Sequence, residues 1–437
     1  HGGARICVPA APEQMTTYIL LEQEDWFEEE IGFVRKLLQP GQSAADIGAN
    51  HGVYTLAMAH AVGPQGRVWA FEPAPPTADL LDRSLAIGGL AQARLLRVAV
   101  SDRSGAARFT VGPHPEWNSV TESDAPGTVP IATATLDDLW REHGWDGIDF
   151  IKIDAEGHDR QVILGGQRLF AAQSPLVMFE IASPTGRDLS LVPLFTAHGY
   201  QTYRLVPGLA LLTPIDTRAP ADPYLLNLFC CKPDRAARLA GAGLLAAGDD
   251  CSVPRLGVHE SFRMARDPLL GPDARLQLLR QSYALAAQEL AASPLLPRML
   301  SYARLAAAYG DRAVAFATLN KAHALLPRQW QDALGEPFLA PCARFESLEM
   351  RAEPRAWLKC AIAEERMRLG YHSSYFGDTE TLPVVEGLAQ NPFRAPETER
   401  RRQLMRLRAG LQSGIEAHPL LATASPWNLN PEFWCGS

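Results

Sequence analysis

Residues 15 to about 235 alternate short β-branched runs with helical segments, which is typical of a parallel, doubly wound α/β sheet. We expect strands at residues 43–48, 67–71, 93–100, 148–153, 175–181, 200–205 and 227–231. Helices fit most of the intervals, at residues 51–62, 76–87, 158–170 and 191–198. Residues 102–133 interrupt this rhythm with Gly, Pro and Ser, so we expect a small β-excursion there, near the mouth of the sheet.

The composition changes after Lys232. Ala, Leu and Arg dominate and the apolar spacing becomes three and four, which predicts an all-α domain. A chain of 437 residues is also longer than the roughly 250–300 residues at which a single core usually stops growing. We therefore expect a sheet domain at residues 1–235 and a helical domain at 236–437, with an irregular linker at 251–271.

One stretch of the helical domain has the spacing of a tetratricopeptide-like hairpin. Its positions are Ala303, Ala306, Ala315, Leu319, Ala322 and Pro327. A repeat solenoid needs about three copies and no second copy is evident, so an ordinary helical bundle is favoured. We expect this domain to bind substrate or to form a homodimer.

The formal net charge of −8 argues against a constitutive nucleic-acid binder, which usually carries a basic excess. The basic run Arg400–Arg401–Arg402 is followed by Leu404 and Leu407 at helical spacing, so we interpret it as a solvated helix face. The seven cysteines show no zinc or disulfide spacing, which predicts free thiols and a cytoplasmic protein. No apolar run reaches the roughly 18 residues that a membrane span needs.

Residues 46–52 (DIGANHG) lie where the first strand meets the first helix, and open parallel sheets bind ligands at such strand ends. Gly48 and Gly52, with Asn50 between them, let the backbone approach a ligand closely. A dinucleotide loop would instead show GxGxxG. Because Asp46 repels a diphosphate but suits a ligand with amino and sulfonium groups, the loop predicts S-adenosylmethionine as its ligand.

Two further strand ends extend this candidate cofactor site. Glu72 ends the second strand 24 residues after Gly48, near the spacing at which an acidic side chain meets a ribose diol. Ser101 and Asp102 follow the third strand and are placed to meet an adenine amino group. A Ser-Asp pair before Gly105 is also a common turn, so both interpretations of the pair stay open.

Two carboxylates and an imidazole, from Asp154, Glu156 and His158, emerge at the end of the fourth strand, which lies beside the first strand in such sheets. This segment would face the methyl group of the cofactor, so Asp154 is also a candidate cofactor contact. An alcohol needs a base to remove its proton, and Asp154 and His158 are both candidates for that base. Glu156 suits the first turn of the following helix, where the helix dipole favours a carboxylate.

The acceptor contacts are expected in the irregular excursion and at the strand ends. The candidates are Trp117, Asn118, Ser119, Glu156 and Glu180. The indole ring of Trp117 would stack on the face of a sugar. Asp154 and Glu180 end neighbouring strands and together suit Mg²⁺ held against a diol. No third ligand is evident, so we expect no metal.

With these segments in order, the chain resembles the FkbM family of methyltransferases over residues 18–232. The resemblance rests on the segments DIGANHG, FEP, VAVSD, Asn118-Ser119, TLDDL, IKIDAEGHD and PLVMFEI. It implies a Rossmann-like class I methyltransferase sheet of seven strands whose last strand runs antiparallel. The helical domain has no counterpart in that family that we can name.

The resemblance also implies roles for the candidate residues. It implies that S-adenosylmethionine is contacted by Asp46, Gly48, Asn50 and Glu72. It implies that the reaction rim holds Asp154, Glu156 and His158. One departure concerns Asp159, which stands where the family usually has a glutamate.

These features and the resemblance together predict an S-adenosylmethionine-dependent O-methyltransferase. The resemblance implies that its acceptor is a small molecule or glycan, carrying a hydroxyl of a sugar, glycolipid or polyketide-type natural product. One alternative is methylation of an amine or a protein side chain, and another is a cofactor-binding module whose helical half recruits a partner. A dehydrogenase is disfavoured because the first loop lacks a phosphate cradle. The acceptor itself does not follow from the fold.

Overall fold

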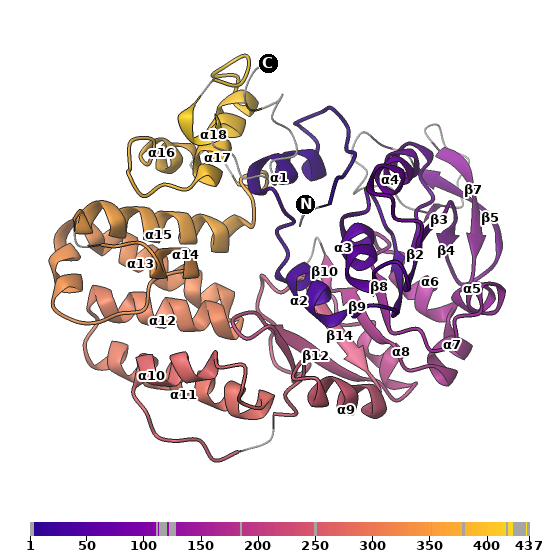
Figure 1. Cartoon of the computed structure of the whole chain (residues 1–437), viewed down its shortest axis with the longest axis horizontal. Coiled ribbons are helices and arrows are strands. Elements are labelled where there is room, and N and C mark those ends of the chain that lie inside the picture. Colours follow the sequence, from indigo (N-terminus) through magenta and orange to yellow (C-terminus); the bar gives the residue numbers. More distant parts are fainter. Residues whose placement is uncertain are drawn as a thin grey trace. The chain divides into compact units, whose positions relative to one another are not determined.

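The computed structural model describes residues 4–110, 112, 120–121, 128–183, 186–248, 251–350, 352–377, 381–416, 418–422 and 434. The chain forms two compact units, each built around its own elements (Figure 1). The first unit comprises His1–Thr16, Glu29–Leu205 and Leu212–Leu245, and the second comprises Thr17–Glu28, Val206–Leu211 and Ala246–Ser437. Two short segments from within the expected sheet domain, 17–28 and 206–211, thus belong to the helical unit.

The first unit contains an eight-stranded sheet of order β13-β12-β14-β9-β8-β1-β2-β3. Its strands are β1 (Ser43–Ile47), β2 (Arg67–Phe71), β3 (Ala93–Leu96), β8 (Phe150–Ile153), β9 (Leu176–Glu180), β12 (Gln201–Val206), β13 (Leu211–Pro214) and β14 (Asn227–Cys231). Within that order, neighbouring strands among β9, β8, β1, β2 and β3 run parallel to each other. Strand β14 lies between β9 and β12 and runs antiparallel to both. The sheet has eight strands rather than the expected seven, because β13 is added at the edge beside β12.

Helices cover both faces of this sheet. They are α2 (Glu29–Leu37), α3 (Val53–Val62), α4 (Pro75–Gly88), α5 (Leu136–His143), α6 (Asp159–Leu164), α7 (Gln167–Ala172), α8 (Val192–Thr196) and α9 (Pro233–Gly241). The single helix expected at 158–170 is divided into α6 and α7 at Gly165 and Gly166. A side chain at Gly165 would overlap with the backbone oxygen of Ser101, so the turn between α6 and α7 lies close to the backbone at Ser101.

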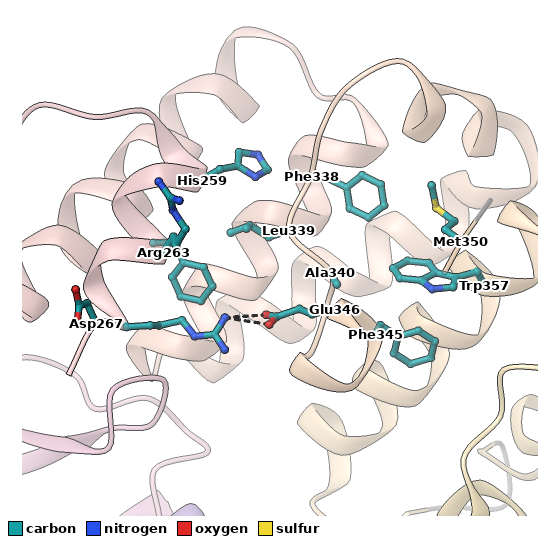
Figure 2. A pocket seen from close by; sticks show the side chains of 12 residues that line it. His259, Arg263, Asp267, Phe338, Leu339, Ala340, Phe345, Glu346, Met350 and Trp357 are labelled. Carbon is teal, nitrogen blue, oxygen red and sulfur yellow. Dashed lines mark hydrogen bonds and ion pairs between the residues drawn. The ribbon is translucent and has the colours of Figure 1, made fainter. Parts of the chain in front are cut away.

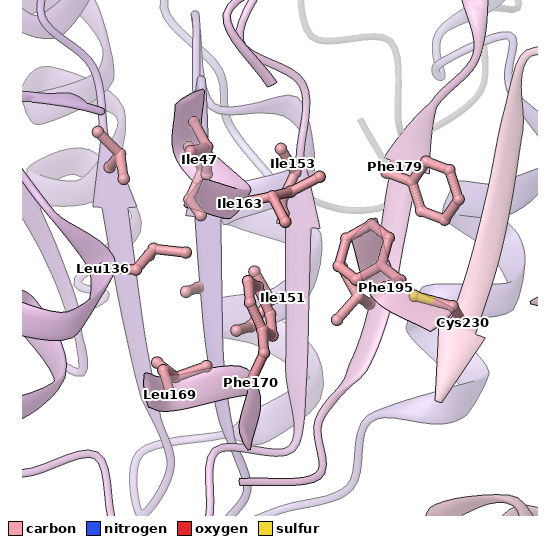
Figure 3. Packing of buried hydrophobic residues seen from close by; sticks show 14 of the residues in the cluster. Ile47, Leu136, Ile151, Ile153, Ile163, Leu169, Phe170, Phe179, Phe195 and Cys230 are labelled. Carbon is pink, nitrogen blue, oxygen red and sulfur yellow. The ribbon is translucent and has the colours of Figure 1, made fainter. Parts of the chain in front are cut away.

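The main core lies between the sheet and helices α5 to α8 (Figure 3). Ile47, Ile151 and Ile153 point from their strands toward Leu136 and Phe170 of these helices (Figure 3). Side chains alternate along a strand with period two, so the residues between these isoleucines lie on the other face. That alternation places Asp46 and Lys152 on the face covered by α3, where Thr55 donates to Asp46.

A second sheet of order β4-β7-β5-β6 occupies the irregular region. Its strands are β4 (Ala99–Val100), β5 (Gly105–Thr110), β6 (Val120–Thr121) and β7 (Thr128–Ala134). The expected β-excursion is confirmed for these described residues. The expected third strand at 93–100 is corrected, because the main sheet keeps only β3 while Ala99 and Val100 pair with Thr133 and Ala134 of β7. A two-stranded ladder of β10 (Ala182–Ser183) and β11 (Gly186–Arg187) follows β9.

The second unit is helical in the part of the chain that the structure describes. Its helices after residue 250 are α10 (Val258–Ala265), α11 (Pro272–Ala292), α12 (Leu296–Tyr309), α13 (Arg312–Gln329), the 3₁₀ helix η2 (Trp330–Leu334), α14 (Ala343–Glu346), α15 (Pro354–Tyr371), α16 (Thr381–Glu386), α17 (Pro396–Arg408) and α18 (Pro419–Ala422). The linker expected at 251–271 is wrong for its middle part, since α10 forms there. Val258, Phe262 and Ala265 recur at helical spacing and are buried.

The tetratricopeptide-like spacing corresponds to the antiparallel pair α12 and α13, joined at Gly310 and Asp311. Its small residues Ala303, Ala306 and Ala315 are buried between the helices. Gly310 adopts a left-handed φ of 98°, which ends α12 and turns the chain. One helical hairpin is therefore present where the sequence suggested one.

The interpretation of the basic run as a solvated helix face is wrong. Arg400 and Arg401 of α17 are only 5% and 3% exposed. Their partners come from helix α1 (Met15–Gln23), near the start of the chain, whose Glu22 is fully buried. Arg401 Nη2 lies 2.6 Å from Glu22 Oε1, and Arg400 donates to the Glu22 carbonyl at 2.7 Å. Burying a charge is unfavourable unless it is paired, so these paired arginines are structural.

Two other expectations concern the whole chain. The six cysteines within the described residues are all free thiols. Among the same residues, no helix combines the length and apolar character that a membrane crossing requires.

Candidate active site

A cavity opens at the carboxyl ends of β1, β2 and β8, with a wall from β4 and β5 of the small sheet. It is lined by Ile47, Gly48, Asn50, Phe71, Glu72, Pro73, Thr77, Val98, Ala99, Val100, Phe109, Asp154, Ala155, Glu156 and His158. Ligands of open parallel sheets bind at this edge. The structure thus brings together most of the strand-end residues that the sequence singled out.

The loop after β1 is shaped by a glycine that approaches another strand end. The amides of Gly48 and Ala49 both donate to the Phe71 carbonyl, which holds the loop against β2. Gly48 has a φ of 75°, and a Cβ there would overlap with the Asp154 carbonyl oxygen. Only glycine meets both requirements without strain. Gly48 therefore sets the separation between the two loops that border the cavity.

Glu72 is a buried carboxylate that orders two loops at once. Its Oε2 accepts from the Asn50 amide at 2.9 Å and its Oε1 accepts from the Ala74 amide at 2.8 Å. Burial raises the pKa of Glu72 to about 7, and the two amides partly offset this rise. Each carboxylate oxygen can accept more than one hydrogen bond, so Glu72 can also bind a ligand hydroxyl in the cavity.

Asp46 does not line the cavity. It lies next to it, in a buried cluster with Lys152. Thr55 donates to Asp46 Oδ2 at 2.5 Å, and Lys152 Nζ lies 3.9 Å from Asp46 Oδ1. The same ammonium group lies 2.9 Å from Asp154 Oδ2 and over the Tyr54 ring. Burial raises the pKa of Asp46, while Lys152 and Thr55 lower it.

His158 lines the cavity and is held from the side by Ser101. The His158 Nε2 lies 2.9 Å from Ser101 Oγ, which in turn donates to Asp102 Oδ1 at 3.2 Å. Neither Ser101 nor Asp102 lines the cavity, although both were expected to contact the cofactor. Burial lowers the pKa of His158, and the charge of Asp102 partly offsets this.

The other candidate residues lie in different places. Gly52 is the N-cap of α3, with a φ of 88°, and packs on Leu81 of α4 outside the cavity. Glu156 lines the cavity from an exposed turn with a φ of 50°. It precedes α6, so the acidic residue in the first turn of α6 is Asp159 instead. Asp159 Oδ1 accepts from the Ala155 amide at 2.8 Å and thereby fixes the turn.

Glu180 ends β9 and does not line the cavity; the Glu180 charge acts on Arg187 of β11. Trp117, Asn118 and Ser119 lie outside the described residues. Within those residues, no group of three or more His, Cys, Asp or Glu side chains is arranged to hold a metal ion.

Sequence reasoning missed Lys152 and the apolar wall of Phe71, Val98 and Phe109. A signal for Lys152 was present, because it is the one charged residue in the otherwise apolar strand FIKI. A lysine at such a position needs a buried partner, and the acidic residue Asp154 follows two positions later.

Comparisons with known proteins agree on the type of domain. Residues 46–202 match the methyltransferase FkbM domain. The 2-O-methyltransferase NoeI of Sinorhizobium fredii is 28% identical over 186 residues, which cover 37% of this chain and 75% of that protein. The 31-O-demethyl-FK506 methyltransferase FkbM of Streptomyces tacrolimicus is 29% identical over 195 residues, covering 37% of this chain and 74% of that protein.

Among solved structures, methyltransferase FkbM from Methylobacillus flagellatus aligns with a TM-score of 0.32 and 16% identity. That alignment covers 46% of this chain and 50% of the other. The matched segment 46–202 contains the loop after β1, Glu72 and the end of β8, which together border the cavity. Residues 46–202 of the chain therefore form a methyltransferase domain that matches the FkbM model, and the methyl donor of such domains is S-adenosylmethionine.

Proposed function

We propose that this enzyme methylates a hydroxyl group of a sugar, glycan, glycolipid or polyketide-type natural product. The observation that carries the proposal is the state of the two candidate bases. Asp154 is ion-paired with Lys152, whereas His158 borders the cavity with a lowered pKa and a fixed ring. A neutral imidazole suits removal of a hydroxyl proton near neutral pH.

The cavity residues fit S-adenosylmethionine. Phe71, Val98 and Phe109 offer an apolar wall that suits a flat purine. The Glu72 carboxylate retains acceptor positions for a ribose diol, and such hydrogen bonds to a charged group are strong. When bound, S-adenosylmethionine supplies a methyl group on a positively charged sulfur. Asp46 and Asp154 carry two carboxylates, and Lys152 is the one ammonium group that lies near both. The remaining negative charge complements the positive charge on the sulfur.

His158 is proposed as the base, and Ser101 as the residue that positions it. Because Ser101 donates its hydroxyl proton to Asp102, the His158 Nε2–H donates to Ser101 Oγ. The lone pair on His158 Nδ1 is then available to take the proton from the hydroxyl group that is methylated. Glu156 and Asp154 border the same cavity and would orient the acceptor. Aligning the two reactants in this way accounts for much of the rate acceleration in a displacement reaction.

The pH dependence of kcat/KM tests the role of His158. Since the folded pKa of His158 is lowered, the imidazole stays neutral as the pH falls below about 6.5, its ordinary pKa. Activity is therefore expected to persist below that value and to fall only as the pH passes through the lower pKa. His158→Ala should remove this acid limb and lower kcat by about 10²–10⁴-fold.

Asp102→Asn provides the matched variant for this experiment. It keeps His158 but removes the charge that raises its pKa, so the acid limb should move to still lower pH. An acid limb that is unchanged in His158→Ala would assign the proton removal to another group.

Titration calorimetry with S-adenosylmethionine tests the role of Glu72. Glu72→Gln is expected to weaken binding by about tenfold or more, because the amide NH₂ faces a backbone N–H that needs an acceptor. In the wild type, affinity should rise as the pH increases through about 7, where Glu72 ionises. Glu142→Gln, an exposed change in α5, should leave affinity unchanged. Equal affinity in Glu72→Gln and wild type would contradict the assignment.

The acceptor class is tested by supplying a panel of small hydroxylated compounds and their amino-substituted analogues with labelled methyl donor. We expect label on oxygen in hydroxylated sugars or polyketide alcohols. The names of the two relatives, which specify transfer at a 2-O and a 31-O position, support this expectation. Label transferred only to amines would favour the alternative acceptor class.

A further inference from the structure

The helical unit contains a cavity that the methyl-transfer site does not use. Its volume is about 630 Å³, within the roughly 300–1,000 Å³ range of small-molecule sites. One wall comes from α10 and the turn after it, and the other from segment 338–340, α14 and α15 (Figure 2). All of its lining residues belong to the second unit.

The first wall is polar and follows one face of a helix. His259, Arg263 and Arg266 recur at spacings of four and three along α10 and its end, so their side chains share a face. Val258 and Ala265 on the opposite side of α10 are buried, which fixes that face toward the cavity. This wall offers hydrogen-bond donors from two guanidinium groups and an imidazole.

The second wall is apolar and aromatic. Phe338, Phe345 and Trp357 lie together with Met350 on this side (Figure 2). The Trp357 ring packs against Phe338 at 6.0 Å and against Phe345 at 5.1 Å, both edge to face. Phe345 and Trp357 are only 1% and 3% exposed and form the back of this wall, so the ring surface open to a ligand comes from Phe338, next to Met350. Trp357 Nε1 already donates to the Leu348 carbonyl.

The two walls are joined by a fixed ion pair. Arg266 Nη1 lies 3.1 and 3.0 Å from the two carboxylate oxygens of Glu346. Dashed lines mark this interaction at Glu346 in Figure 2. Arg304 holds the same carboxylate from behind at 3.0 Å. Glu346 is thereby kept ionised and oriented, and the two arginines lower its pKa against the effect of burial.

The charges around the cavity balance. Arg263 and Arg266 face Asp267 and Glu346, so the formal charges of the lining sum to zero with histidine neutral. Arg266 is paired with Glu346 and Arg263 lies 3.8 Å from Glu260, so the cavity offers no cluster of unpaired cations to a polyanion. A wholly apolar ligand would remove charged groups from water without pairing them, which is unfavourable. A ligand with both donors and acceptors on one edge and an apolar face on the other satisfies both walls.

We propose that this cavity binds a saccharide of one or two residues. A sugar ring presents C–H groups on its face, which pack on aromatic rings, and a rim of hydroxyls that both donate and accept hydrogen bonds. The hydroxyls meet the guanidinium donors of α10 and the acceptor carboxylates of Asp267 and Glu346. The site is distinct from the methyl-transfer cavity, and its ligand is either a free sugar or the glycosyl part of a larger acceptor.

Saturation-transfer NMR and titration calorimetry of the full chain, without methyl donor, test this proposal. The probes are neutral mono- and disaccharides covering hexoses, N-acetylhexosamines and 6-deoxyhexoses, with octanoate and inorganic phosphate as contrasting ligands. We expect at least one saccharide to bind. Phe338→Ala and Arg263→Ala should each weaken that binding by about tenfold, as expected for loss of an aromatic contact or a charged donor.

Arg255→Ala is the matched control, because Arg255 is exposed in the same region but does not line the cavity. It should bind saccharide as the wild type does. Binding of octanoate or phosphate alone, binding of no probe, or saccharide binding unaffected by both cavity variants would each overturn the proposal. A separate assay with labelled methyl donor then distinguishes the two sources: a bound saccharide that gains no label is a free ligand, and one that gains label is part of an acceptor. Because no methyl donor is present in the binding experiment, failure there leaves the proposed methyl transfer untouched.

Discussion

Gly48→Ala is expected to lower methyl-transfer activity by about 100-fold or more, because small displacements of reacting groups cost that much. The new Cβ would overlap with the Asp154 carbonyl oxygen, so the ends of β1 and β8 must move apart. The left-handed φ of 75° adds strain of about 1–2 kcal/mol for a residue with a side chain. Together with overpacking, the loss in unfolding free energy should reach about 2–5 kcal/mol.

Gly89→Ala separates these two contributions. Gly89 at the end of α4 also has a left-handed φ, of 63°, but a Cβ there would meet nothing within 4 Å. This variant should lose only the backbone term of about 1–2 kcal/mol and should keep full activity. Chemical denaturation and activity assays of both variants provide the measurement. If the two variants behaved alike, the close approach of Gly48 to Asp154 would not be what the enzyme needs.

Lys152→Met is expected to have the second large effect, a loss of about 3–5 kcal/mol near neutral pH. It removes the ammonium group that lies between Asp46 and Asp154 and leaves a buried carboxylate without compensation. The folded pKa of Asp46 is already raised by burial, and loss of Lys152 raises it further. A raised folded pKa means that stability is retained at low pH and lost as the pH rises through that pKa.

The deficit of Lys152→Met relative to wild type should therefore shrink at acid pH, where Asp46 is protonated and needs no cation. Denaturant unfolding at about pH 8 and about pH 5 measures this difference. Arg97→Met is a suitable control, since Arg97 and Asp79 form an exposed ion pair at 2.7 Å with side chains 44% and 67% exposed. Such pairs contribute about 0–1 kcal/mol. A deficit that is equal at both pH values would show that Lys152 acts through packing alone.

The fold of the first unit was predictable because the sheet repeats a simple pattern. The runs around Ile47, Ile153 and Phe179 are buried on both faces and mostly apolar, as parallel strands in such sheets are, with Asp46 and Lys152 as the charged exceptions. The strand order then places three strand ends side by side, and this brings Gly48, Glu72 and Asp154 to one cavity. Their proximity follows from topology, which the alternation of strands and helices indicates.

Other features of the site and of the helical unit depend on three-dimensional geometry that the spacing of residues in the sequence does not indicate. Asp46 belongs to the same motif as Gly48, yet the two-residue period of β1 turns its side chain toward Thr55. Ser101 and Asp102 follow β4 of the small sheet and do not line the cavity. Ser101 contacts His158, and Asp102 accepts from Ser101. In the helical unit, α10 was missed because the helix has only eight residues and its neighbours in the sequence include Pro, Gly and Arg.

The burial of Glu22 against α17 has a consequence for how the chain is made. Glu22 contacts Ser373, Ser374 and Arg401, which follow it by about 350 to 380 positions in the chain. During synthesis this early segment leaves the ribosome long before the helices that surround it. The helical unit can close only after translation has passed Arg401, and a fragment that starts after the sheet would lack the Glu22 and Glu24 partners of Arg400 and Arg401.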